Sequence, residues 1–481
     1  MKLLSELVAS LDHFTTYGTI DRRVTSIEND SRHCHLDSLF VAISGTTTDG
    51  HIYIDTAIAN GARTIVCEIL PDILREDCTY LQLLSARKAC ARLAHAFYDQ
   101  PSQSIRIIGV TGTNGKTTIT FLLKQMLEYF GEKIGLIGTT GNYIGQDYYP
   151  TNYTTPEAPE LVRLLSQMRN ESVTTVVMEV SSHSLSMDRV LGIHFSGAIF
   201  TNLTHDHLDY HSTMENYSDA KKILFDSLTP SSIAVFNSDS TYADYLASTT
   251  QARTVFVGRN HNPDYRITDE MISAEGSVFS LNGTAFSTPL VGRFNIDNCA
   301  ACIAYLLQSG YPIPEIQQAI PTAHGAPGRM ESYLLPNGAT AIIDYAHTPD
   351  ALENALLTCK ELIRLNGKLM VVFGCGGNRD KAKRPEMGRI AELYADVIYL
   401  TNDNPRTESP DTIIHDICLG IINVSSVHQI PDRTLAIDTA ISNSVAHDII
   451  LIAGKGHETY QIIQSEKRYC SDKDEVMKHI K

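Results

Sequence analysis

The segment Gly112-Thr113-Asn114-Gly115-Lys116-Thr117-Thr118 has the residue types of a loop that holds a nucleoside triphosphate. Glycines let backbone N–H groups approach the phosphates, a following helix N-terminus adds positive potential, and a lysine neutralises the β- and γ-oxygens. A threonine directly after that lysine can bind Mg²⁺. The strict GxxxxGK[ST] spacing fails, because position 110 is Val and the upstream glycine is Gly109. A chance glycine turn is the alternative, and the strand–loop–helix context described below favours ATP binding.

A second group of reactive side chains lies in Thr204-His205-Asp206-His207-Leu208-Asp209-Tyr210-His211, directly after a strand-like run. Gathering titratable groups at a strand end is costly unless they bind metal or substrate, and a solvated loop is the alternative. Histidine and aspartate also suit zinc or manganese, but a nearby phosphate loop favours Mg²⁺. Glu179 closes another apolar run just before Ser181. It is equally consistent with a metal ligand and with a satisfied strand-end carboxylate.

These groups need strands and helices that place them at a common edge. The apolar run RIIGV precedes the glycine-rich loop, and ITFLLKQMLEYF follows it. The apolar residues of the second run recur on one helical face, at Ile119, Leu122, Leu123, Met126, Leu127 and Phe130. Further apolar runs at 175–180, 198–203 and 233–237 are separated by helical stretches. This pattern predicts an α/β fold whose central sheet is parallel and covered on both faces.

Stretches rich in Pro and Gly divide the chain. Residues 1–100 alternate short strand-like and helical runs before Pro101, and PTAHGAPGRME at 321–331 marks a second boundary. Beyond it, four apolar strands each precede a polar or glycine-rich loop, in ATAIIDYAHTPDA, KLMVVFGCGGNRD, DVIYLTNDNPR and DIILIAGKGHE. Such units predict a Rossmann-like domain with its ligands at the carboxyl ends of the strands. We therefore predict three domains, at 1–100, 101–325 and 326–481.

The composition fits three compact domains and excludes several classes of protein. The 481 residues are 43% hydrophobic and 20% charged, which excludes disorder as the main state. The net charge, 39 Lys+Arg minus 55 Asp+Glu, is −16, which argues against a general affinity for nucleic acid or anionic membrane. The N-terminus lacks the apolar core of a signal peptide, and no apolar run approaches the roughly 18 residues needed to span a membrane. We expect a cytoplasmic protein.

The ten cysteines are scattered rather than spaced as a disulfide framework, which fits a reducing compartment. Cys299 and Cys302 form the only CxxC, and no second pair or histidine follows at zinc spacing. We predict a buried structural pair on a helix.

Several segments together resemble the Mur ligase family of bacterial cell-wall synthesis: TGTNGKTT, MEVSSH, TNLTHDHLDYH, GRFNIDN, PGRME, DYAHTPDAL, DNPR and AGKGHE. Their order and spacing cover almost the whole chain. A folylpolyglutamate synthetase would share the ATP motifs but not the N-terminal or DNPR segments. The resemblance implies that ATP phosphorylates a carboxylate to an acyl phosphate, with Mg²⁺ as cofactor. An amine then attacks this intermediate and releases phosphate.

The resemblance also implies which residues hold the nucleotide and the metal. Lys116 and Thr117 would hold the triphosphate end, and Glu179 and His207 match the family's magnesium ligands. Lys221 matches the lysine that family members carry as a carbamate, N6-carboxylysine, which is an anionic oxygen ligand suited to a second Mg²⁺. Taken without the resemblance, Lys221 would be a solvated helix lysine.

Three further positions match nucleotide contacts of the family. Asn298 matches an adenine-contacting asparagine, Asp344 a ribose-binding acid, and Arg329 an arginine that reaches from the linker to the γ-phosphate. Since Arg329 lies at the second domain boundary, we expect it to complete the site only when the C-terminal domain closes.

The resemblance implies that the acceptor substrate is a UDP-N-acetylmuramoyl-dipeptide. Its matched contacts in the central domain are Thr154, Thr155, Ser181, Met187 and Arg189. Arg189 provides a fork for carboxylate or pyrophosphate, whereas Met187 departs from relatives that carry Gln there. In the N-terminal domain, the residues that match contacts to the UDP moiety are Asn29, Ser31, Thr46, Thr47 and Thr48. Without the resemblance this threonine run would be a plain surface loop.

The incoming amino acid is indicated by Asp403-Asn404-Pro405-Arg406. Arg406 offers a bidentate partner for the distal carboxylate that diaminopimelate has and lysine lacks. Arg379, Gly454 and Glu458 complete the pocket implied by the resemblance, with the acid placed to take the distal ammonium. The expected substrate is meso-diaminopimelate, and L-lysine or another diamino acid is the alternative.

A nucleotide-dependent switch or binding module is the alternative of another class. It would explain the phosphate loop, but not the cluster at 204–211 or the strand-end sites of the C-terminal domain. We expect a monomer that binds neither nucleic acid nor membrane.

Overall fold

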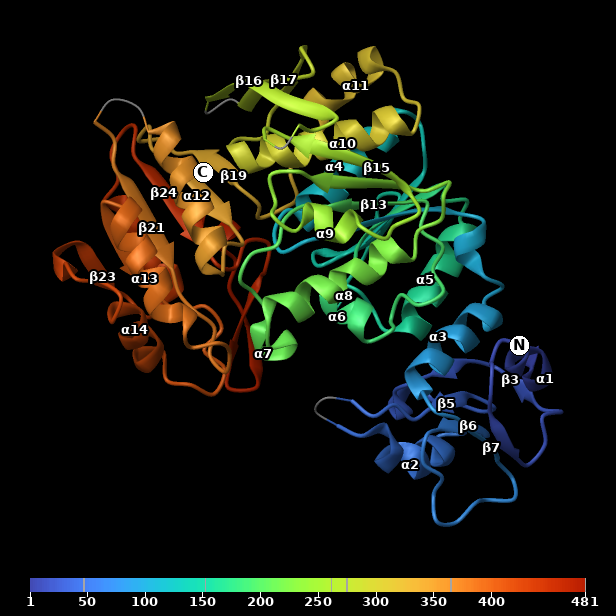
Figure 1. Cartoon of the computed structure of the whole chain (residues 1–481). Helices are drawn as coiled ribbons and strands as arrows, with labels where there is room; N and C mark the ends of the chain where they lie inside the picture. The colour runs from blue at the N-terminus through green and yellow to red at the C-terminus, as the bar shows by residue number, and fades with distance from the viewer. Residues whose placement is uncertain (46–47, 152, 261, 274–275, 364–365, 481) are drawn as a thin grey trace.

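The computed structural model describes the chain except for residues 46–47, 152, 261, 274–275, 364–365 and 481. Among the described residues, three large sheets follow one another along the sequence, and each is the centre of one body of the molecule (Figure 1). The N-terminal body lies below the central one, and the C-terminal body lies beside it. Among the described residues, no helix has the length and apolar character that crossing a membrane requires.

The N-terminal body has a five-stranded sheet in the order β2-β7-β6-β5-β4. Its apolar residues pack against helices on both faces. The strands are β2 (Thr15–Tyr17), β4 (Ile27–Glu28), β5 (Leu39–Val41), β6 (Thr64–Cys67) and β7 (Thr79–Gln82), with a separate pair β1 (Lys2–Leu3) and β3 (Arg23–Val24). The helices are α1 (Leu4–Val8), α2 (Ile54–Ala59) and α3 (Ala86–Phe97). Helix α3 packs against α5 (Ala158–Asn170) of the central body and so connects the two bodies.

The central body has an eleven-stranded sheet in the order β11-β10-β9-β12-β8-β13-β14-β15-β16-β17-β18. The parallel centre consists of β8 (Arg106–Thr111), β9 (Ile134–Gly138), β12 (Thr175–Glu179), β13 (Gly197–Phe200), β14 (Ile233–Asn237) and β15 (Arg253–Gly258). Mostly antiparallel strands extend it at both edges, namely β10 (Gly141–Ile144), β11 (Asp147–Tyr149), β16 (Tyr265–Ser273), β17 (Gly276–Leu281) and β18 (Thr284–Thr288). The sequence predicted the parallel centre but not these edges.

Two apolar clusters cover the two faces of this central sheet. One face carries α4 (Lys116–Tyr129), α10 (Arg293–Gln308) and α11 (Ile313–Ala319). The other carries α5 (Ala158–Asn170), α6 (Ser182–Ser186), α8 (Met214–Asp226) and α9 (Ala243–Ala247), with α7 (Leu208–His211) nearby. Cys299 and Cys302 are fully buried on α10, as predicted, and all ten cysteines are free thiols.

The C-terminal body has a six-stranded sheet in the order β19-β20-β24-β21-β22-β23. All its strand pairs are parallel except the one between β19 and β20. The strands are β19 (Glu331–Leu334), β20 (Thr340–Asp344), β21 (Leu369–Phe373), β22 (Val397–Leu400), β23 (Val427–Gln429) and β24 (Ile449–Ala453), followed by the hairpin β25 (Tyr460–Ile463) and β26 (Glu466–Tyr469). Helices α12 (Pro349–Leu362), α13 (Lys383–Tyr394) and α14 (Pro410–Cys418) cover one face, and α15 (Arg433–Ser442) and α16 (Asp472–Lys478) the other. The predicted α/β class with a Rossmann-like C-terminal sheet is confirmed.

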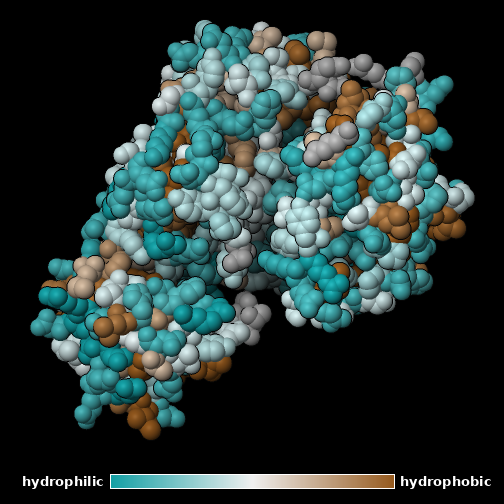
Figure 2. All heavy atoms as spheres, turned by 180° about the vertical axis from the view of Figure 1, so that it is seen from behind, coloured by the Kyte–Doolittle hydropathy of each residue, from teal (hydrophilic) through white to brown (hydrophobic). Residues whose placement is uncertain are grey.

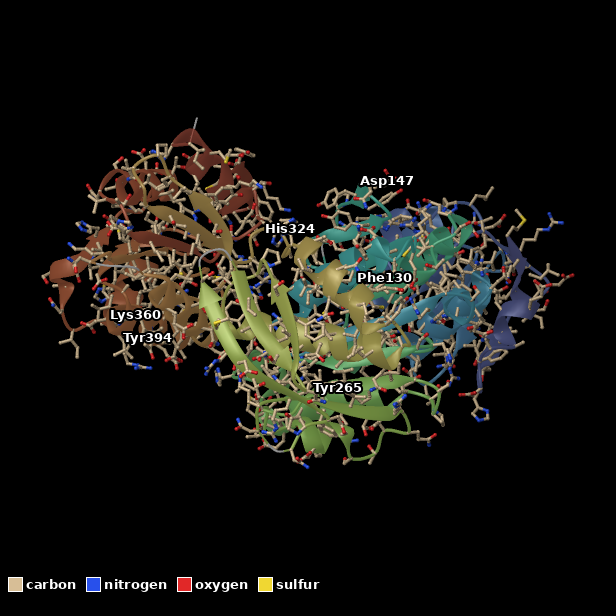
Figure 3. All side chains as sticks on the ribbon, turned by 90° about the horizontal axis from the view of Figure 1, so that it is seen from above. Phe130, Asp147, Tyr265, His324, Lys360 and Tyr394 are labelled. Carbon is tan, nitrogen blue, oxygen red and sulfur yellow. The ribbon has the colours of Figure 1, made fainter. Side chains whose placement is uncertain are left out.

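A short linker joins the central and C-terminal bodies, and Figure 3 shows His324 between them. The His324 backbone N–H donates to Gln125 Oε1 at 2.9 Å, and the Gln125 amide returns a bond to the His324 carbonyl at 2.8 Å. Ala326 is buried against Phe121. Gly328 has φ +67°, and a Cβ there would overlap the backbone around His457. The linker is therefore fixed to α4 at one end and lies against the loop after β24 at the other.

Candidate active site

The glycine-rich loop lies between β8 and α4, with Gly115 in a left-handed conformation at φ +88° before the helix. A Cβ on Gly115 would lie 2.5 Å from Asn298 Oδ1, and one on Gly112 would overlap the Thr201 hydroxyl. Only glycine fits at these two positions, because the loop packs directly against the ends of β13 and α10. The predicted phosphate loop and the predicted adenine contact are therefore neighbours.

Two lysines converge on this loop. Lys116 Nζ donates to the carbonyls of Gly112 at 2.9 Å and Thr113 at 2.8 Å, and Lys221 Nζ donates to the same Gly112 carbonyl at 2.9 Å. Burial lowers the pKa of Lys116. Burial, and next the charge of Lys116, lower the pKa of Lys221 well below its ordinary value. A neutral amine is the form that reacts to give a carbamate, so this environment suits the modification predicted for Lys221.

A pocket opens between this loop and the C-terminal body. It is lined by Asn114, Gly115, Thr118, Ile119, Phe200, Thr201, Asn202, Asn237, Phe294, Asn295, Asp297, Asn298, Ala301, Arg329, Asp344, Asp350, Ala351, Asn354 and Ala355. The predicted nucleotide residues Asn298, Arg329 and Asp344 are thus brought to one pocket. In the space-filling view from behind, the surface is hollowed between the C-terminal body and the other two (Figure 2).

Two residues of this pocket can form further hydrogen bonds with a ligand. Arg329 Nε is buried and has no hydrogen-bond partner among the described residues, and the guanidinium lies 4.6 Å from the centre of the Tyr345 ring. Asp344 accepts from the backbone N–H groups of Met330 and Ala346, each at 2.8 Å. Burial raises the pKa of Asp344. A buried carboxylate and an unpaired guanidinium nitrogen suit a ligand that carries both hydroxyl groups and phosphates.

Asp350 is a pocket residue that the sequence did not reveal. Its Oδ2 accepts from Asn114 Nδ2 at 2.7 Å and from the Thr204 hydroxyl at 3.3 Å, so it joins α12 to the phosphate loop. In the sequence it resembles an ordinary first-turn acid of a helix that follows a capping threonine, Thr348.

The residues predicted to hold Mg²⁺ lie around Lys116. Glu179 is 1% exposed at the end of β12, and its carboxylate accepts from the N–H and hydroxyl of Thr139 at 2.9 and 3.1 Å. Glu179 interacts electrostatically with Lys116. His207 adopts φ +54°, and burial lowers its pKa to about 4, so its ring is neutral at physiological pH.

No group of three or more His, Cys, Asp and Glu side chains in the described chain forms a metal site. The donor set of one carboxylate, the Thr117 hydroxyl and a neutral imidazole fits an ion that takes its other ligands from phosphates and water, as Mg²⁺ does. Both Glu179 and Thr117 are buried near the lysine of the phosphate loop, since Thr117 directly follows Lys116 and Glu179 interacts electrostatically with it.

The predicted dipeptide contacts gather near the carboxyl end of β12. The Thr154 and Thr139 hydroxyls are 3.0 Å apart, and the Thr155 hydroxyl donates to the Glu179 carbonyl at 2.8 Å. Arg189 donates to the Thr155 carbonyl at 3.1 Å. Ser181 caps α6, its side chain accepting from the Ser184 N–H at 3.1 Å.

Arg189 is already partnered in this structure. It forms an ion pair with Glu157 at 2.8 Å and donates to Met187 Sδ at 3.4 Å, whereas its buried Nε has no partner among the described residues. An anionic substrate would therefore have to share or displace Glu157. Arg87 of the N-terminal body lines the same small hollow as Arg189.

The residues predicted for the UDP moiety lie on the N-terminal body. Ser31 is buried at the start of a short 3-10 helix, and Asn29 is half-buried two residues before it. Arg32 of this helix interacts electrostatically with Tyr153 of the central body, the residue before Thr154. Thr48 is exposed, and Thr46 and Thr47 lie outside the described residues.

The residues predicted for the incoming amino acid meet at the carboxyl ends of β21, β22 and β24. A Cβ on Gly454 would lie 2.9 Å from Asp403 Oδ2, and Asn404 donates to Glu458 Oε2 at 3.1 Å. Arg406 donates to the Gly377 carbonyl at 2.8 Å. Pro405 is buried, with its carbonyl against Gly377.

The charged side chains of this pocket include the two arginines Arg379 and Arg406 and the pair of Glu458 with Lys455. Arg406 forms no ion pair with any described residue, and burial followed by the charge of the exposed Arg379 lowers the pKa of Arg406. Glu458 pairs with the fully buried Lys455 at 2.7 Å. Burial would raise the pKa of Glu458, but Lys455 lowers it. The pocket thus places the guanidinium groups of Arg379 and Arg406 near two carboxylates, those of Asp403 and Glu458. Lys455 is a partner of Glu458 that the sequence did not reveal.

Comparison with known proteins agrees with this architecture. Residues 110–306 match the Mur ligase middle domain, residues 328–456 the Mur ligase glutamate ligase domain, and residues 23–98 the Mur ligase family catalytic domain. The chain belongs to the Mur ligase family. It is therefore a ligase and not a nucleotide-dependent switch protein.

Two similar sequences and one similar solved structure share one described activity. UDP-N-acetylmuramoyl-L-alanyl-D-glutamate–2,6-diaminopimelate ligase of Phocaeicola vulgatus is 41% identical over 479 residues, covering 99% of each chain. The ligase of the same description from Bacillus velezensis is 43% identical over 456 residues, covering 93% of this chain and 92% of the relative. A solved structure of a ligase of this description has 35% identity and a TM-score of 0.67, and covers 95% of this chain and 94% of that one.

Proposed function

We propose that this ligase uses ATP to join meso-diaminopimelate to UDP-N-acetylmuramoyl-L-alanyl-D-glutamate in the synthesis of peptidoglycan precursors. The observation that carries the choice of amino acid is the pocket of Arg379, Arg406 and Glu458. Arg406 interacts electrostatically with Asp403 and Glu458 but forms no direct ion pair with either, nor with any other described residue, which supports a ligand that brings its own carboxylate. Glu458 supports a ligand that also brings an ammonium group. The described activity of the similar proteins supports the same substrates.

The proposed reaction has two steps. The free carboxylate of the dipeptide attacks the γ-phosphorus of ATP, so that ADP leaves and an acyl phosphate forms. The amine of diaminopimelate then attacks the acyl carbon, and inorganic phosphate leaves as the amide bond is completed. Both steps bring anions together, so positive groups must lower their repulsion before positioning can help.

Residues around the phosphate loop would meet this requirement. Lys116, which now donates to two loop carbonyls, turns to the β- and γ-phosphates, and Arg329 offers its unpaired Nε to the γ-phosphate. Asp344 and Asn298 take the ribose and the adenine. Glu179, His207, Thr117 and carbamylated Lys221 would hold Mg²⁺, which when bound neutralises phosphate charge. Arg189 would orient the dipeptide.

We assign the three bodies to 1–100, 101–325 and 326–481, as binding units for UDP, ATP and the amino acid. The N-terminal contacts would be Asn29, Ser31 and the threonines at 46–48. We place the enzyme in the cytoplasm as a monomer, a location supported by its ten free thiols.

Steady-state phosphate release by the purified full-length protein tests this function. With ATP and the UDP-dipeptide present, we expect release to require the amino acid, and kcat/KM to be larger for meso-diaminopimelate than for L-lysine. Mass detection of the tripeptide product identifies the bond formed. A preference for L-lysine would show that Arg406 does not read a distal carboxylate.

The Arg406→Lys substitution tests whether Arg406 recognises the distal carboxylate of the amino acid. Lysine keeps the charge but loses the two-pronged contact, so KM for meso-diaminopimelate should rise about tenfold or more, with KM for ATP unchanged. Arg468→Lys, on the exposed β26 of the same body, is the matched control and should change neither constant.

A further inference from the structure

Arg433 and Asp472 form an ion pair that is buried directly behind the amino-acid pocket. Both side chains are 0% exposed, and Arg433 Nε and Nη2 donate to the two carboxylate oxygens of Asp472 at 2.7 Å each. Arg433 is the first residue of α15, and Asp472 is the first residue of α16. Neither residue is among those predicted to touch a substrate.

The same guanidinium also holds the bases of two pocket loops. Nη2 donates to the Ala453 carbonyl at 3.0 Å, and Nη1 donates to the Asn402 carbonyl at 3.4 Å. Ala453 immediately precedes Gly454, and Asn402 immediately precedes Asp403. One side chain thus contacts the loop that carries Glu458 and the loop that carries Arg406.

The strand order explains why such a connection is useful. In the C-terminal sheet β21 lies between β24 and β22, so these two strands share no backbone hydrogen bonds that could set the spacing of their loops. Arg433 spans this gap. It therefore links the bases of the two loops, which the sheet does not join, in addition to the bond from Asn404 to Glu458 further along the same loops.

Stability alone is a weak explanation for this pair. Removing two charges from water is costly, and replacing a buried ion pair by apolar side chains of similar volume is often neutral or stabilising. Burial would lower the pKa of Arg433, but Asp472 raises it, so the guanidinium is charged at every physiological pH. The charged form is the one that donates to Asp472 and to both loop carbonyls at once.

We infer that Arg433, oriented by Asp472, is a positioning residue that fixes the distance between the Asp403–Arg406 and Gly454–Glu458 segments, and so sets recognition of the distal end of the incoming amino acid. The inference rests on the proposed function for the identity of that amino acid. Beyond that function, it gives the buried pair of Arg433 and Asp472 a role in holding the two loops of the pocket in place.

The double variant Arg433→Met with Asp472→Leu tests this inference. It removes both charges together, so no unpaired charge stays buried and we expect it to fold. Its KM for meso-diaminopimelate should rise about tenfold to a hundredfold, because errors of about 1 Å in a site have effects of that size. KM for ATP and for the UDP-dipeptide should stay within about twofold, and preference over L-lysine should fall.

The matched control is Glu475→Leu with Lys478→Met, which removes an ion pair of 2.7 Å from the exposed side of the same helix, α16. It should leave all three KM values unchanged. An unchanged KM for the amino acid in the Arg433/Asp472 double variant would overturn the inference.

A conservative variant covers the case in which the double variant does not fold. Arg433→Lys keeps the charge beside Asp472 but lacks the donors to reach both carbonyls, so it should fold and still raise KM for the amino acid alone. An unchanged KM would again overturn the inference. If the wild-type enzyme prefers L-lysine, the proposed substrate is wrong, and KM for L-lysine then decides the role of Arg433 in the same way.

Discussion

Lys116 and Lys221 donate to one carbonyl oxygen, that of Gly112, in the interior of the molecule. Burial, and next the charge of Lys116, lower the pKa of Lys221 well below its ordinary value. Since Lys221 is 1% exposed, it has lost the hydration that would stabilise its charge. A buried lysine of this kind lowers the stability of the folded protein. Its presence is therefore better explained by a role in the reaction.

The Lys221→Met substitution should separate these two effects. The free energy of unfolding should rise by about 1 kcal/mol at neutral pH, because the methionine side chain carries no charge into the interior. Turnover should fall at least about a hundredfold, because the carbamate proposed for Lys221, an anionic ligand near the phosphates, can no longer form. Denaturant unfolding and phosphate release measure the two quantities.

Lys222→Met is the control for this experiment. Lys222 pairs with Asp226 on the outward side of α8, and its replacement should leave turnover unchanged. A Lys221→Met enzyme with wild-type turnover would remove Lys221 from the catalytic residues.

The loops at the carboxyl ends of β21, β22 and β24 are the elements that form the amino-acid pocket. Their approach is close enough to require Gly454, which has φ +112° and lies against Asp403. Gly454→Ala should therefore both strain the backbone and displace Asp403. We expect a loss of about 1 kcal/mol in stability and a rise of about tenfold in KM for the amino acid.

Gly310→Ala separates strain from displacement. Gly310 has a similar φ of +93°, but nothing lies within 4 Å of the position of its Cβ. The two variants should lose similar stability in thermal unfolding, and only Gly454→Ala should change KM. Equal KM values would mean that the approach of these loops does not shape the pocket.

Elements with a single strong physical cause could be predicted from the sequence. The runs that form β8, β12, β13 and β14 are mainly apolar, with polar residues at the ends of β8, β12 and β14, because both faces of their sheet are covered. By contrast, β16 carries Asp269 and Glu270 and is buried at few positions, so hydrophobicity gave no signal for it. Its pairing depends on β15 and β17, which supply the backbone partners.

The candidate site shows the same division. Loops that follow apolar strands were predictable as site segments, because parallel strands bring their carboxyl ends to one edge. The residues that pair with one another within the site could not be predicted. Arg433 and Asp472 are 39 residues apart, and Asn114 and Asp350 are 236 apart, so only the folded chain shows that they meet. The ion pair of Arg189 with Glu157 was equally invisible in the sequence.

At the scale of the whole molecule, contacts between the bodies carry titratable groups. His95, near the end of α3, is 2% exposed, and its ring lies 2.9 Å from where a Cβ on Gly192 of the central body would be. Burial lowers its pKa from 6.5 to about 4. Below pH 6.5 the unfolded chain therefore binds a proton at His95. The folded protein binds a proton there only at about pH 4.

This difference gives a pH-dependent stability with a defined sign. The free energy of unfolding should fall as pH falls from 6.5 towards 4, with His95 contributing up to about 1.4 kcal/mol per pH unit. His95→Leu should remove that part of the slope in denaturant titrations across this window. His13→Leu, at an exposed position of the same body, should keep the wild-type slope. An unaltered slope in His95→Leu would show that this ring does not resist protonation.

The linker has a consequence for how ligands influence one another. Its first part is held to α4 by Gln125, and Gly328 lies against the backbone of the loop that carries Glu458, next to Arg329. Because Arg329 lines the nucleotide pocket and Gly328 touches the Glu458 loop, we expect a movement of Arg329 towards a bound nucleotide to shift that loop as well. Binding free energies coupled in this way are reciprocal. By whatever factor ATP tightens the hold on the amino acid, the amino acid must tighten the hold on ATP.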